Sequence, residues 1–211
     1  MEAGGGKELN QEKSCPLHSL LSRKEGRPLR RITKEVKDHE RVTELLNSTR
    51  VGYLGLYDEE GTYVVPLNFT WYNEKIYFHG SDQGRKFDAL QKEGTICFTV
   101  AQDLGTITNP VPAKTGTAYL SVMVFGSVHV VTDPREATEA LQSMLDKYVP
   151  GYFAKPLSQK HVEKYRSSMG SATVVCRIDP DRITAKEDSG NPGQMYYPGR
   201  KQEDDLGNRL K

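Results

Sequence analysis

The sequence has 211 residues, of which 36% are hydrophobic and 27% charged, which suits one domain of roughly 150 residues plus tails. Its 29 basic and 28 acidic residues nearly cancel, so no cationic excess would attract nucleic acid or an anionic membrane surface. No apolar run approaches the roughly 20 residues of a membrane span, and the first residues lack the apolar core of a secretion signal. We therefore expect a cytoplasmic protein with no nucleic-acid partner and no membrane partner.

Cysteine and histidine spacing argues against cross-links and metals. Cys15, Cys97 and Cys176 are odd in number and form no CxxC pair, and the five histidines show no zinc spacing such as HxxxH. These patterns predict neither disulfides nor a bound metal.

Composition divides the chain into three parts. Residues 1–29 mix glycines and charges with few large apolar groups, which predicts a flexible N-terminal arm; an arm laid on a partner subunit is the alternative. Residues 30–185 carry the periodic hydrophobic segments of one domain. Residues 186–211 are turn-rich and polar, and we expect a C-terminal tail or a surface-wrapping segment.

The first half of the domain predicts one helix and then an antiparallel meander. Apolar residues recur at near-helical spacing from Lys34 to Thr49, which indicates an amphipathic surface helix. Three strand-like segments separated by the turn formers DEEG and NE then span 50–57, 62–72 and 75–80. A short helix at about 84–92 and a strand, TICFTVAQ, follow. Residues 103–117 are rich in Gly, Pro and Thr, and we expect a long loop.

The second half predicts a central strand and a well-capped helix. Residues 118–132 form a long β-branched run, with Gly126 as a bulge or bend. Asp133 as N-cap, Pro134 at the first helical position and Glu136 completing a capping box predict the next helix. A second helix near 157–168, a strand at 171–179 and a last short strand, RITAKE, complete the domain. Many short strands with few helices favour a closed antiparallel barrel flanked by helices.

The stretch IYFHGSDQGRKFDAL, residues 76–90, predicts an anion site. Alternation places Tyr77 and His79 on the strand face opposite the apolar anchors. Glycines and a helix start would expose N–H groups to an anion, which Arg85 and Lys86 would neutralise, and a phosphate ester suits such a site. The glycine spacing differs from that of a nucleoside triphosphatase loop. The alternative is a capped turn with two solvated cations.

Two further strands carry polar features. Pro66 in VPLNF cannot donate to a sheet ladder, so neighbouring backbone groups stay free for a polar heterocycle, and Asn68 shares its face. The alternative is an ordinary edge-strand proline. Ser121 is a hydroxyl inside an apolar strand, and it would bond either to backbone or to a cofactor phosphate.

In this order on successive strands, these elements resemble the pyridoxamine 5'-phosphate oxidase-like FMN-binding split barrels. The likeness is greatest to the branch containing the 5-nitroimidazole resistance flavoproteins, and it runs from about Arg30 to Ile183 through VGYLGL, VVPLNF, IYFHGSDQGRKFDAL, ICFTV, YLSVMVFGSV and VVCRID. The resemblance implies a mainly β fold, a six-stranded antiparallel Greek-key split barrel with flanking helices. It also implies a homodimer that holds one FMN in each of two clefts between the subunits.

The resemblance also suggests which residues bind the cofactor. The VPLNF strand would follow the isoalloxazine ring, Arg85 and Lys86 would take the phosphate, and His79 would lie near flavin and substrate as the candidate catalytic residue. The expected cofactor-binding residues are Val65, Pro66, Leu67, Asn68, Tyr77, His79, Gly84, Arg85, Lys86, Ser121 and Val122. The chain lacks the C-terminal Trp- and Arg-containing motif of true pyridoxamine phosphate oxidases, because Trp71 is its only tryptophan. Vitamin B6 oxidation is therefore not expected.

The leading hypothesis is an FMN-dependent oxidoreductase that acts on a small planar acceptor such as a nitroaromatic, a nitroimidazole reductase-like activity. A non-catalytic flavin-binding protein is the first alternative. A haem-binding or haem-degrading split barrel is the second, with His79 or His129 as the axial ligand.

Overall fold

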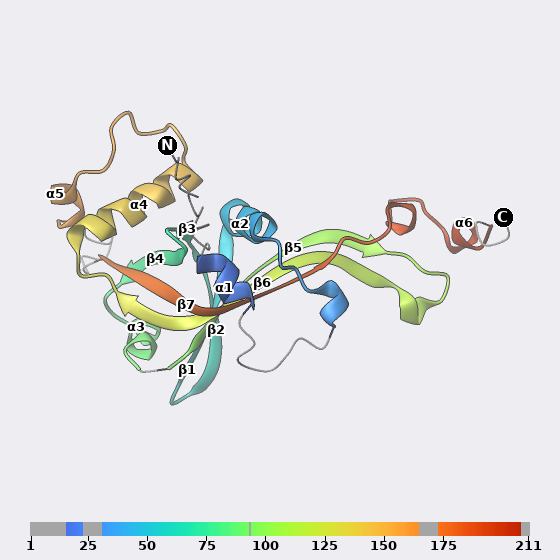
Figure 1. The fold of residues 1–211 in the computed structure, drawn as a ribbon, viewed down its shortest axis with the longest axis horizontal. Coiled ribbons are helices and arrows are strands. Elements are labelled where there is room, and N and C mark those ends of the chain that lie inside the picture. Colours follow the sequence, from blue (N-terminus) through green and yellow to red (C-terminus); the bar gives the residue numbers. More distant parts are fainter. Residues whose placement is uncertain (1–15, 23–30, 93, 165–172, 208–211) are drawn as a thin grey trace, which may run out of the picture.

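The computed structural model describes residues 16–22, 31–92, 94–164 and 173–207. A strongly curved sheet lies at the centre, helix α4 covers one end of it, and a long arm built on β5 and β6 extends from the other (Figure 1). The strands are β1 (Val51–Asp58), β2 (Gly61–Asn68), β3 (Thr70–Tyr72), β4 (Lys75–Ser81), β5 (Ile96–Ile107), β6 (Gly116–Val130) and β7 (Thr173–Asp188). The helices are α1 (Pro16–Ser22), α2 (His39–Ser48), α3 (Arg85–Leu90), α4 (Pro134–Tyr148), α5 (Gln159–Val162) and α6 (Gln202–Gly207), with 3-10 turns at Ile32–Lys34, Pro112–Lys114 and Pro192–Gln194.

The sheet is an antiparallel barrel that is split at one point. Its seven strands follow the order β2-β1-β5-β6-β7-β4-β3, so β2 and β3 are the two edges. Phe69 alone separates the end of β2 from the start of β3. Because a single residue joins the two edges, the sheet must curl until they meet. This architecture confirms the mainly β, antiparallel barrel fold.

The structure has seven strands where the resemblance implies six, and its strand boundaries differ from the predicted ones at two places. The segment predicted as one strand at 62–72 is divided at Phe69, whose side chain is fully buried in the core. The last two predicted strands are instead one, β7, which pairs along most of β6. The register shifts between Phe125 and Gly126, where a Cβ on Gly126 would lie 2.0 Å from the Asp179 carbonyl oxygen. The predicted bulge at Gly126 is confirmed.

Aromatic packing fills the barrel. The Phe69 and Phe98 rings meet edge to face with centroids 4.9 Å apart. A Cβ on Gly52 would lie 2.0 Å from Cζ of Phe98, so the ring occupies the space that a side chain at this position would need. Position 52 is therefore restricted to glycine by close packing, with β1 passing directly over the ring.

Helix α2 covers one side of the barrel but is shorter than predicted. It begins at His39, where the Asp38 carboxylate accepts hydrogen bonds from two backbone N–H groups. Val42, Leu45 and Leu46 are buried. Val36 lies outside the helix, because its N–H donates to the Ala185 carbonyl on β7 instead.

Helix α4 has the predicted N-terminal cap at Asp133, but the side chain of its first glutamate, Glu136, makes other contacts than predicted. Asp133 accepts from the Arg135 N–H and Pro134 begins the helix, as expected. The Glu136 carboxylate accepts from Tyr77 Oη at 2.9 Å and from Arg177 Nη1 at 2.8 Å. The predicted capping box is therefore wrong, since this side chain connects the helix to the sheet.

The predicted loop at 103–117 is wrong at both of its ends. β5 continues to Ile107 and β6 starts at Gly116, so the ladder extends into an arm and the turn is only 108–115. A bulge between Asp103 and Gly105 bends β5, and Gly105 takes a φ of 120° there. The bulge lets the strand turn away from the barrel without losing its pairing.

The described part of the predicted C-terminal tail lies along this arm (Figure 1). Thr108 N–H donates to the Gln194 carbonyl at 2.7 Å, and Tyr196 N–H donates to the Thr106 carbonyl at 2.8 Å. Arg200 forms an ion pair with Asp205, whose carboxylate also accepts from Thr108 Oγ1. Residues 189–207 therefore brace the hairpin.

Within the predicted N-terminal arm, α1 packs on the barrel, because Leu17 and Leu20 are buried there. The rest of residues 1–29 lies outside the described part of the chain. The second predicted helix appears as the single turn α5, and its positions 165–168 also lie outside that part.

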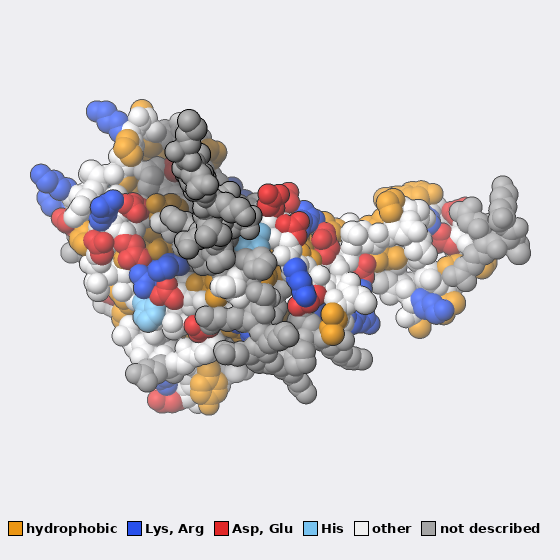
Figure 2. Space-filling view, in the orientation of Figure 1, with side chains coloured by type: hydrophobic (Ala, Val, Ile, Leu, Met, Phe, Trp, Pro, Cys, Tyr) orange, Lys and Arg blue, Asp and Glu red, His pale blue; other side chains and the backbone are white. Residues whose placement is uncertain are grey.

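None of the described helices combines the length and the apolar character needed to cross a membrane. Acidic and basic side chains are interspersed over the visible face (Figure 2).

Candidate functional site

The predicted strand, turn and helix at residues 76–90 are confirmed, with β4 ending at Ser81 and α3 starting at Arg85. Ile76 and Phe78 are fully buried in the barrel core. Tyr77 and His79 lie on the opposite face of β4, toward α4. The two outward side chains of β4 therefore lie in the crevice between sheet and helix rather than in the barrel.

Gly84 has a structural reason to be glycine. It is the N-cap of α3 with a φ of 94°, a left-handed conformation that L-residues rarely adopt. Since α3 has only six residues, its dipole contributes little, and any anion bound here depends on side-chain charge.

Arg85 is engaged by acidic side chains. Its Nε lies 2.6 Å from Asp58 Oδ2 and its Nη2 2.9 Å from Asp58 Oδ1, a bidentate pair, while Nη1 lies 3.0 Å from Glu60. The guanidinium also stacks on the Tyr63 ring at 4.1 Å. The hydrogen bond from Arg85 is the main cause that lowers the pKa of Asp58. Arg85 thus connects α3 to the β1–β2 hairpin.

Lys86 has the opposite environment. Its Nζ lies 2.6 Å from the position that a Cβ on Gly80 would occupy and 5.9 Å from the centroid of the Phe78 ring. Among the described residues it has no carboxylate within ion-pair distance. The missing side chain at Gly80 therefore leaves room for a lysine that crosses the end of β4 and keeps its charge unpaired.

Two buried oxygen atoms near this junction lack hydrogen-bond partners among the described residues. They are Oη of Tyr63, whose ring lies beneath Arg85, and Oδ1 of Asp82 in the turn before α3. Buried polar atoms are rarely left unsatisfied in folded proteins. The β4–α3 junction is therefore a place where an additional polar group would be accommodated.

His79 lines a cavity on the face of β4 opposite Phe78. Partial burial, and second the positive charge of Lys86, lower the pKa of this histidine. Its side chain stays accessible from the cavity. A neutral imidazole at this place can donate or accept one hydrogen bond at each ring nitrogen.

The cavity beside His79, which we call the α4 pocket, has a volume of about 550 Å³. It lies between α4 and the segment that follows it. Its lining residues are His79, Leu141, Met144, Leu145, Phe153, Lys155, Pro156, Leu157, Ser158, His161 and Val162. The wall is mostly apolar, and the polar groups include two histidines and one lysine but no carboxylate.

Tyr77 is closed off from ligands. It is 3% exposed, and its hydroxyl donates to Glu136. Arg177 binds Glu136 and Asp179, and Lys75 also reaches Asp179 at 3.0 Å. Burial alone would raise the pKa of Glu136, but the hydrogen bonds from Arg177 and Tyr77 outweigh it and lower the pKa. This cluster ties α4 to β4 and β7.

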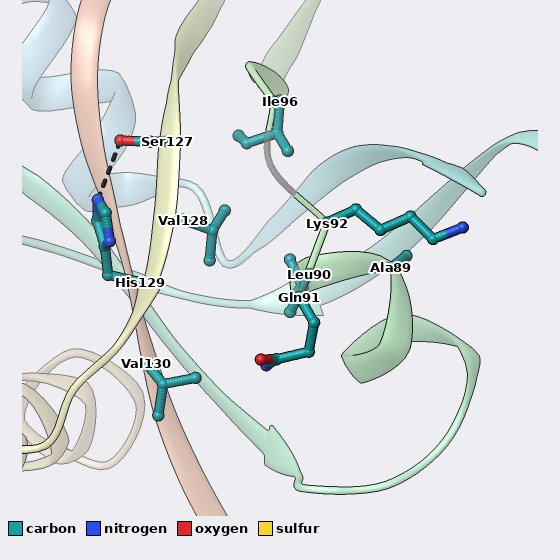
Figure 3. A pocket seen from close by; sticks show the side chains of 10 residues that line it. Ala89, Leu90, Gln91, Lys92, Ile96, Ser127, Val128, His129 and Val130 are labelled. Atoms are coloured by element: carbon teal, nitrogen blue, oxygen red, sulfur yellow. Dashed lines mark hydrogen bonds between the residues drawn. The ribbon is translucent and has the colours of Figure 1, made fainter.

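A second cavity, of about 490 Å³, lies between the end of α3 and the end of β6 (Figure 3). Ser127 Oγ lies 3.1 Å from His129 Nε2, and Asp179 Oδ2 lies 3.5 Å from the same nitrogen. A serine–histidine–aspartate relay needs the two partners on opposite ring nitrogens. This geometry therefore does not form a hydrolytic triad, and His129 is an exposed histidine beside an acidic neighbour.

The expected cofactor-binding residues of β2 and β6 lie on two opposite faces of the sheet. Pro66 and Asn68 are exposed on the outer side of the barrel, and Ser121 is half-buried on that side. Val65 and Leu67 pack against the core, and Val122 is fully buried within it. Val122 can therefore reach a ligand only through its backbone atoms, whereas Val65 and Leu67 are partly buried.

Ser121 and Lys86 lie at different places along the sheet. Ser121 is nine residues along β6 from Val130, which pairs with Cys176 beside Phe78 on β4. At about 3.3 Å per residue, roughly 30 Å of strand separates Ser121 from the junction. The expected cofactor residues therefore form two groups, one on β4 and α3 and one on β2 and β6.

The outer sheet face near Pro66 carries exposed apolar side chains. Pro66, Tyr53, Thr99 and Met123 are successive partners across four strands. We call this surface the outer sheet face. Its large exposed apolar residues include Val51 (41%), Tyr53 (49%), Val64 (62%) and Met123 (39%). A contiguous apolar sheet surface of this kind is typical of an interaction site.

Several residues of the site could not be named from the sequence. Asp58 lies 27 positions before Arg85 in a turn that looks ordinary, and Tyr63 is one of 11 tyrosines. Only the acidic run DEEG beside a strand end could have suggested a partner for a basic turn. In the described part of the chain, no three His, Cys, Asp or Glu side chains are grouped so as to hold a metal ion.

A sequence profile described as pyridoxamine 5'-phosphate oxidase matches residues 38–187, which is most of the chain. The protein therefore belongs to the pyridoxamine 5'-phosphate oxidase family. A search of curated proteins found no match.

Solved structures share the fold at low sequence identity. The flavocytochrome Anf3 from Azotobacter vinelandii is 24% identical with a TM-score of 0.65, and the match covers 85% of this chain and 78% of that one. The FAD and heme binding protein from Mycobacterium smegmatis is 19% identical with a TM-score of 0.63, over 82% and 80% of the two chains. A proposed 5-nitroimidazole antibiotic resistance protein from Bacteroides thetaiotaomicron is 24% identical with a TM-score of 0.56, over 72% and 85%. At these identities the likeness shows the fold alone.

Proposed function

We propose that the protein is a homodimeric FMN-dependent oxidoreductase whose acceptor is a small planar molecule such as a nitroaromatic. The observation that carries the proposal is Lys86, an unpaired lysine directed across Gly80 at the end of β4. Family membership supports it, as does the presence of flavin-binding proteins among the structures of the same fold.

The residues present fit a flavin phosphate. Lys86 supplies a positive charge with no acidic partner among the described residues, and charge-assisted hydrogen bonds to a phosphate are strong. Arg85 has a different role, because Asp58 and Glu60 already neutralise it. It holds α3 against the β1–β2 hairpin and so positions its neighbour Lys86.

The ring of the cofactor would lie against the exposed edge of β2. Pro66 has no N–H to satisfy, and the exposed Asn68 amide offers both a donor and an acceptor to a heterocycle. When bound, FMN supplies the redox chemistry by accepting a hydride from a donor such as a reduced nicotinamide and passing electrons on. His79 would present a neutral ring nitrogen to the acceptor, orient it and hold a proton there.

The dimer follows from the separation of the two groups of residues. Ser121 and Lys86 lie on parts of the sheet that are well separated along the strands, which supports a cofactor bound between two copies of the chain. The outer sheet face supplies an apolar surface for that association, next to Pro66 and Ser121. Cofactor retention is then coupled to dimerisation.

The test is to purify the protein, identify what denaturation releases, and follow anaerobic reduction by NADH and NADPH. We expect FMN at one per chain, bleaching of the flavin absorbance on donor addition, and reoxidation by a nitroaromatic. FMN that no donor reduces would point to a non-catalytic flavin-binding protein. Absence of flavin, with no binding of added FMN, would contradict the proposal.

Haem is the second candidate, because His79 and His161 line one mostly apolar cavity of about 550 Å³. Imidazole nitrogens in an apolar pocket are the usual axial ligands of haem. This candidate moves the second histidine from His129 to His161, since His129 lies in the other cavity, beside Ser127 and Asp179. A Soret band that is lost in both His79→Ala and His161→Ala would establish it. A purified protein without that band, which also fails to bind added haemin, would exclude it.

A further inference from the structure

We infer that the α4 pocket is a binding site for a flat aromatic molecule that carries an anionic group, and that this molecule is the electron acceptor. The second half of this inference rests on the proposed flavin function, whereas the binding chemistry does not. It is argued from the shape of the pocket, its charge, and the position of His79.

The pocket has the size and the wall of a small-molecule site. Its volume of about 550 Å³ lies within the range of about 300–1,000 Å³ that is common for such sites. Leu141, Met144 and Leu145 on α4 line it, and so does Phe153 from the segment after the helix. Flat aromatic rings suit a slot between aliphatic side chains and one aromatic face.

The wall opposite α4 is held in place by specific contacts. The Leu157 N–H donates to Oε1 of Gln142 on α4 at 2.8 Å. Phe153 packs edge-on against Tyr152 with centroids 4.9 Å apart. The hydrogen bond to Gln142 therefore holds the segment beside α4 at Leu157.

The charges that face the pocket select an anion. Lys155, His161 and His79 line it, and none of the lining residues is acidic. Glu163, on the turn after α5, is bonded to Gln159 and does not line the pocket. A cavity of about 520 Å³ on the other side of Pro156 and Leu157 has the reverse character, because Glu139 and Asp146 line it. The two cavities share one wall and differ in charge.

His79 connects the pocket to the proposed flavin site. It lines the pocket, and it directly precedes Gly80, across which Lys86 lies on the other face of the strand. In the proposed pose the anionic group of the ligand pairs with Lys155 and its ring contacts His79. The ring of an acceptor would then point to the end of β4, where the cofactor is proposed to bind.

The test measures binding to the purified full-length protein by calorimetry, with naphthalene-2-sulfonate as the probe. The cation 2-naphthylmethylammonium has the same ring system and serves as the matched control. We expect one site per chain for the sulfonate, with the ammonium compound bound at least about fivefold more weakly, because exposed charges contribute modestly. Equal affinity for both compounds, or no sulfonate binding, would overturn the inference.

Variants locate the site. Lys155→Gln combined with His161→Gln should weaken sulfonate binding roughly five- to tenfold, since the Lys155 charge and the His161 ring nitrogens are removed. Lys160→Gln is the matched control, because Lys160 lies on α5 but does not line the pocket. Both changes are at exposed positions, so folding should be unaffected. Unchanged affinity in the double variant would overturn the assignment of the pocket.

The claim that the ligand of this pocket is the electron acceptor is tested by a separate measurement. In flavin-loaded protein, 1,4-naphthoquinone-2-sulfonate should be reduced with a KM that rises in the Lys155→Gln/His161→Gln variant, while the rate of flavin reduction by the donor is unchanged. Sulfonate binding in a protein that takes up no flavin would preserve the pocket and remove the proposed function. Flavin turnover with an unchanged KM in the variant would contradict the pocket as the acceptor site and leave the proposed function intact.

Discussion

Neighbouring residues of the motif at 76–90 differ in whether an acidic side chain binds them. Tyr77, on the first half of β4, is buried under α4 and hydrogen-bonded to Glu136, whereas His79, two residues later, faces an open cavity. The same division recurs on α3, where Arg85 is paired with Asp58 and Lys86 is not. Adjacent residues of a motif therefore divide into supporting and ligand-facing groups, and partners from distant elements decide which is which.

The largest expected effect comes from the unpaired cation. Lys86→Met should weaken FMN binding by about 10- to 100-fold, since a charge-assisted hydrogen bond contributes about 1.5–3 kcal/mol. Arg85→Met is the matched variant, because it removes a neighbouring cation that is already neutralised, and its effect on affinity should be under about threefold. Fluorescence titration of the apoprotein with FMN measures both. If Arg85→Met had the larger effect, the division between these residues would be wrong.

The supporting cluster should affect stability rather than binding. Glu136→Gln should lower the free energy of unfolding by about 1–2 kcal/mol, because Arg177 and Tyr77 lose a charged acceptor. FMN affinity should not change. Urea denaturation and the same titration test both statements, and Thr138→Ala on the exposed side of α4 serves as a control for the helix itself.

The pH dependence of this cluster has a definite sign. The folded pKa of Glu136 is lower than its ordinary value of 4.5, so its contribution to stability is present above that pH and is lost as the pH falls through the folded pKa. The stability difference between the natural protein and Glu136→Gln should therefore shrink on acidification below about pH 4.5. A difference that grows on acidification would contradict the assignment of the ion pair with Arg177.

The glycine under Lys86 should give a smaller effect. A Cβ at position 80 would lie 2.6 Å from Lys86 Nζ, so Gly80→Ala should displace the flexible end of the lysine. We expect FMN affinity to fall about fivefold, as for a charge-assisted contact that is weakened and not removed. In a Lys86→Met background the same change should have no further effect on affinity. An additive loss in the double variant would show that Gly80 acts independently of Lys86.

The smallest effect concerns a second lysine without an acidic partner among the described residues. Lys147 Nζ donates to the Leu46 carbonyl at 3.0 Å and lies 3.7 Å from the Phe69 ring centroid. Burial, with a smaller contribution from Arg50, lowers its pKa to about 8. Lys147 therefore shows that an unpaired cation can be accommodated by backbone and ring contacts alone.

The pH dependence of Lys147 follows from that shift. Between pH 8 and 10.5 the unfolded chain holds the proton and the folded protein releases it, so the free energy of unfolding rises through this window. Relative to Lys147→Met, the natural protein should gain about 0.5–1 kcal/mol between pH 7 and 10, a value reduced because the group is partly exposed. Denaturation at the two pH values measures the difference. A constant difference would show that the contacts to Leu46 and Phe69 offset the burial.

Much of the fold followed from local patterns. The cap at Asp133, the proline that starts α4 and the alternation in β4 depend on residues close in sequence, and the structure agrees with all three. The bulge at Gly126 was also predictable, because a glycine inside a β-branched run has few other roles. The family was recognisable from the order of the motifs.

The remaining features depend on contacts between distant residues. The break at Phe69 arises because the barrel closes there. The residues before Phe69 pair with β1, and the residues after it pair with β4. The arm forms because residues 189–207 supply hydrogen bonds to a hairpin that would be marginal alone. Neither the pairing of Arg85 with Asp58 nor the α4 pocket leaves a periodic signal, since each joins elements that approach only in the folded chain.

The most direct test of the central claim compares FMN with riboflavin, which lacks the phosphate, in the natural protein and in Arg85→Met and Lys86→Met. The ratio of the two dissociation constants isolates the phosphate contribution. We predict that the natural protein and Arg85→Met prefer FMN by about 10- to 100-fold and that Lys86→Met has lost most of that preference. A preference that survives in Lys86→Met, or one that disappears in Arg85→Met alone, would contradict the assignment of Lys86 as the phosphate ligand.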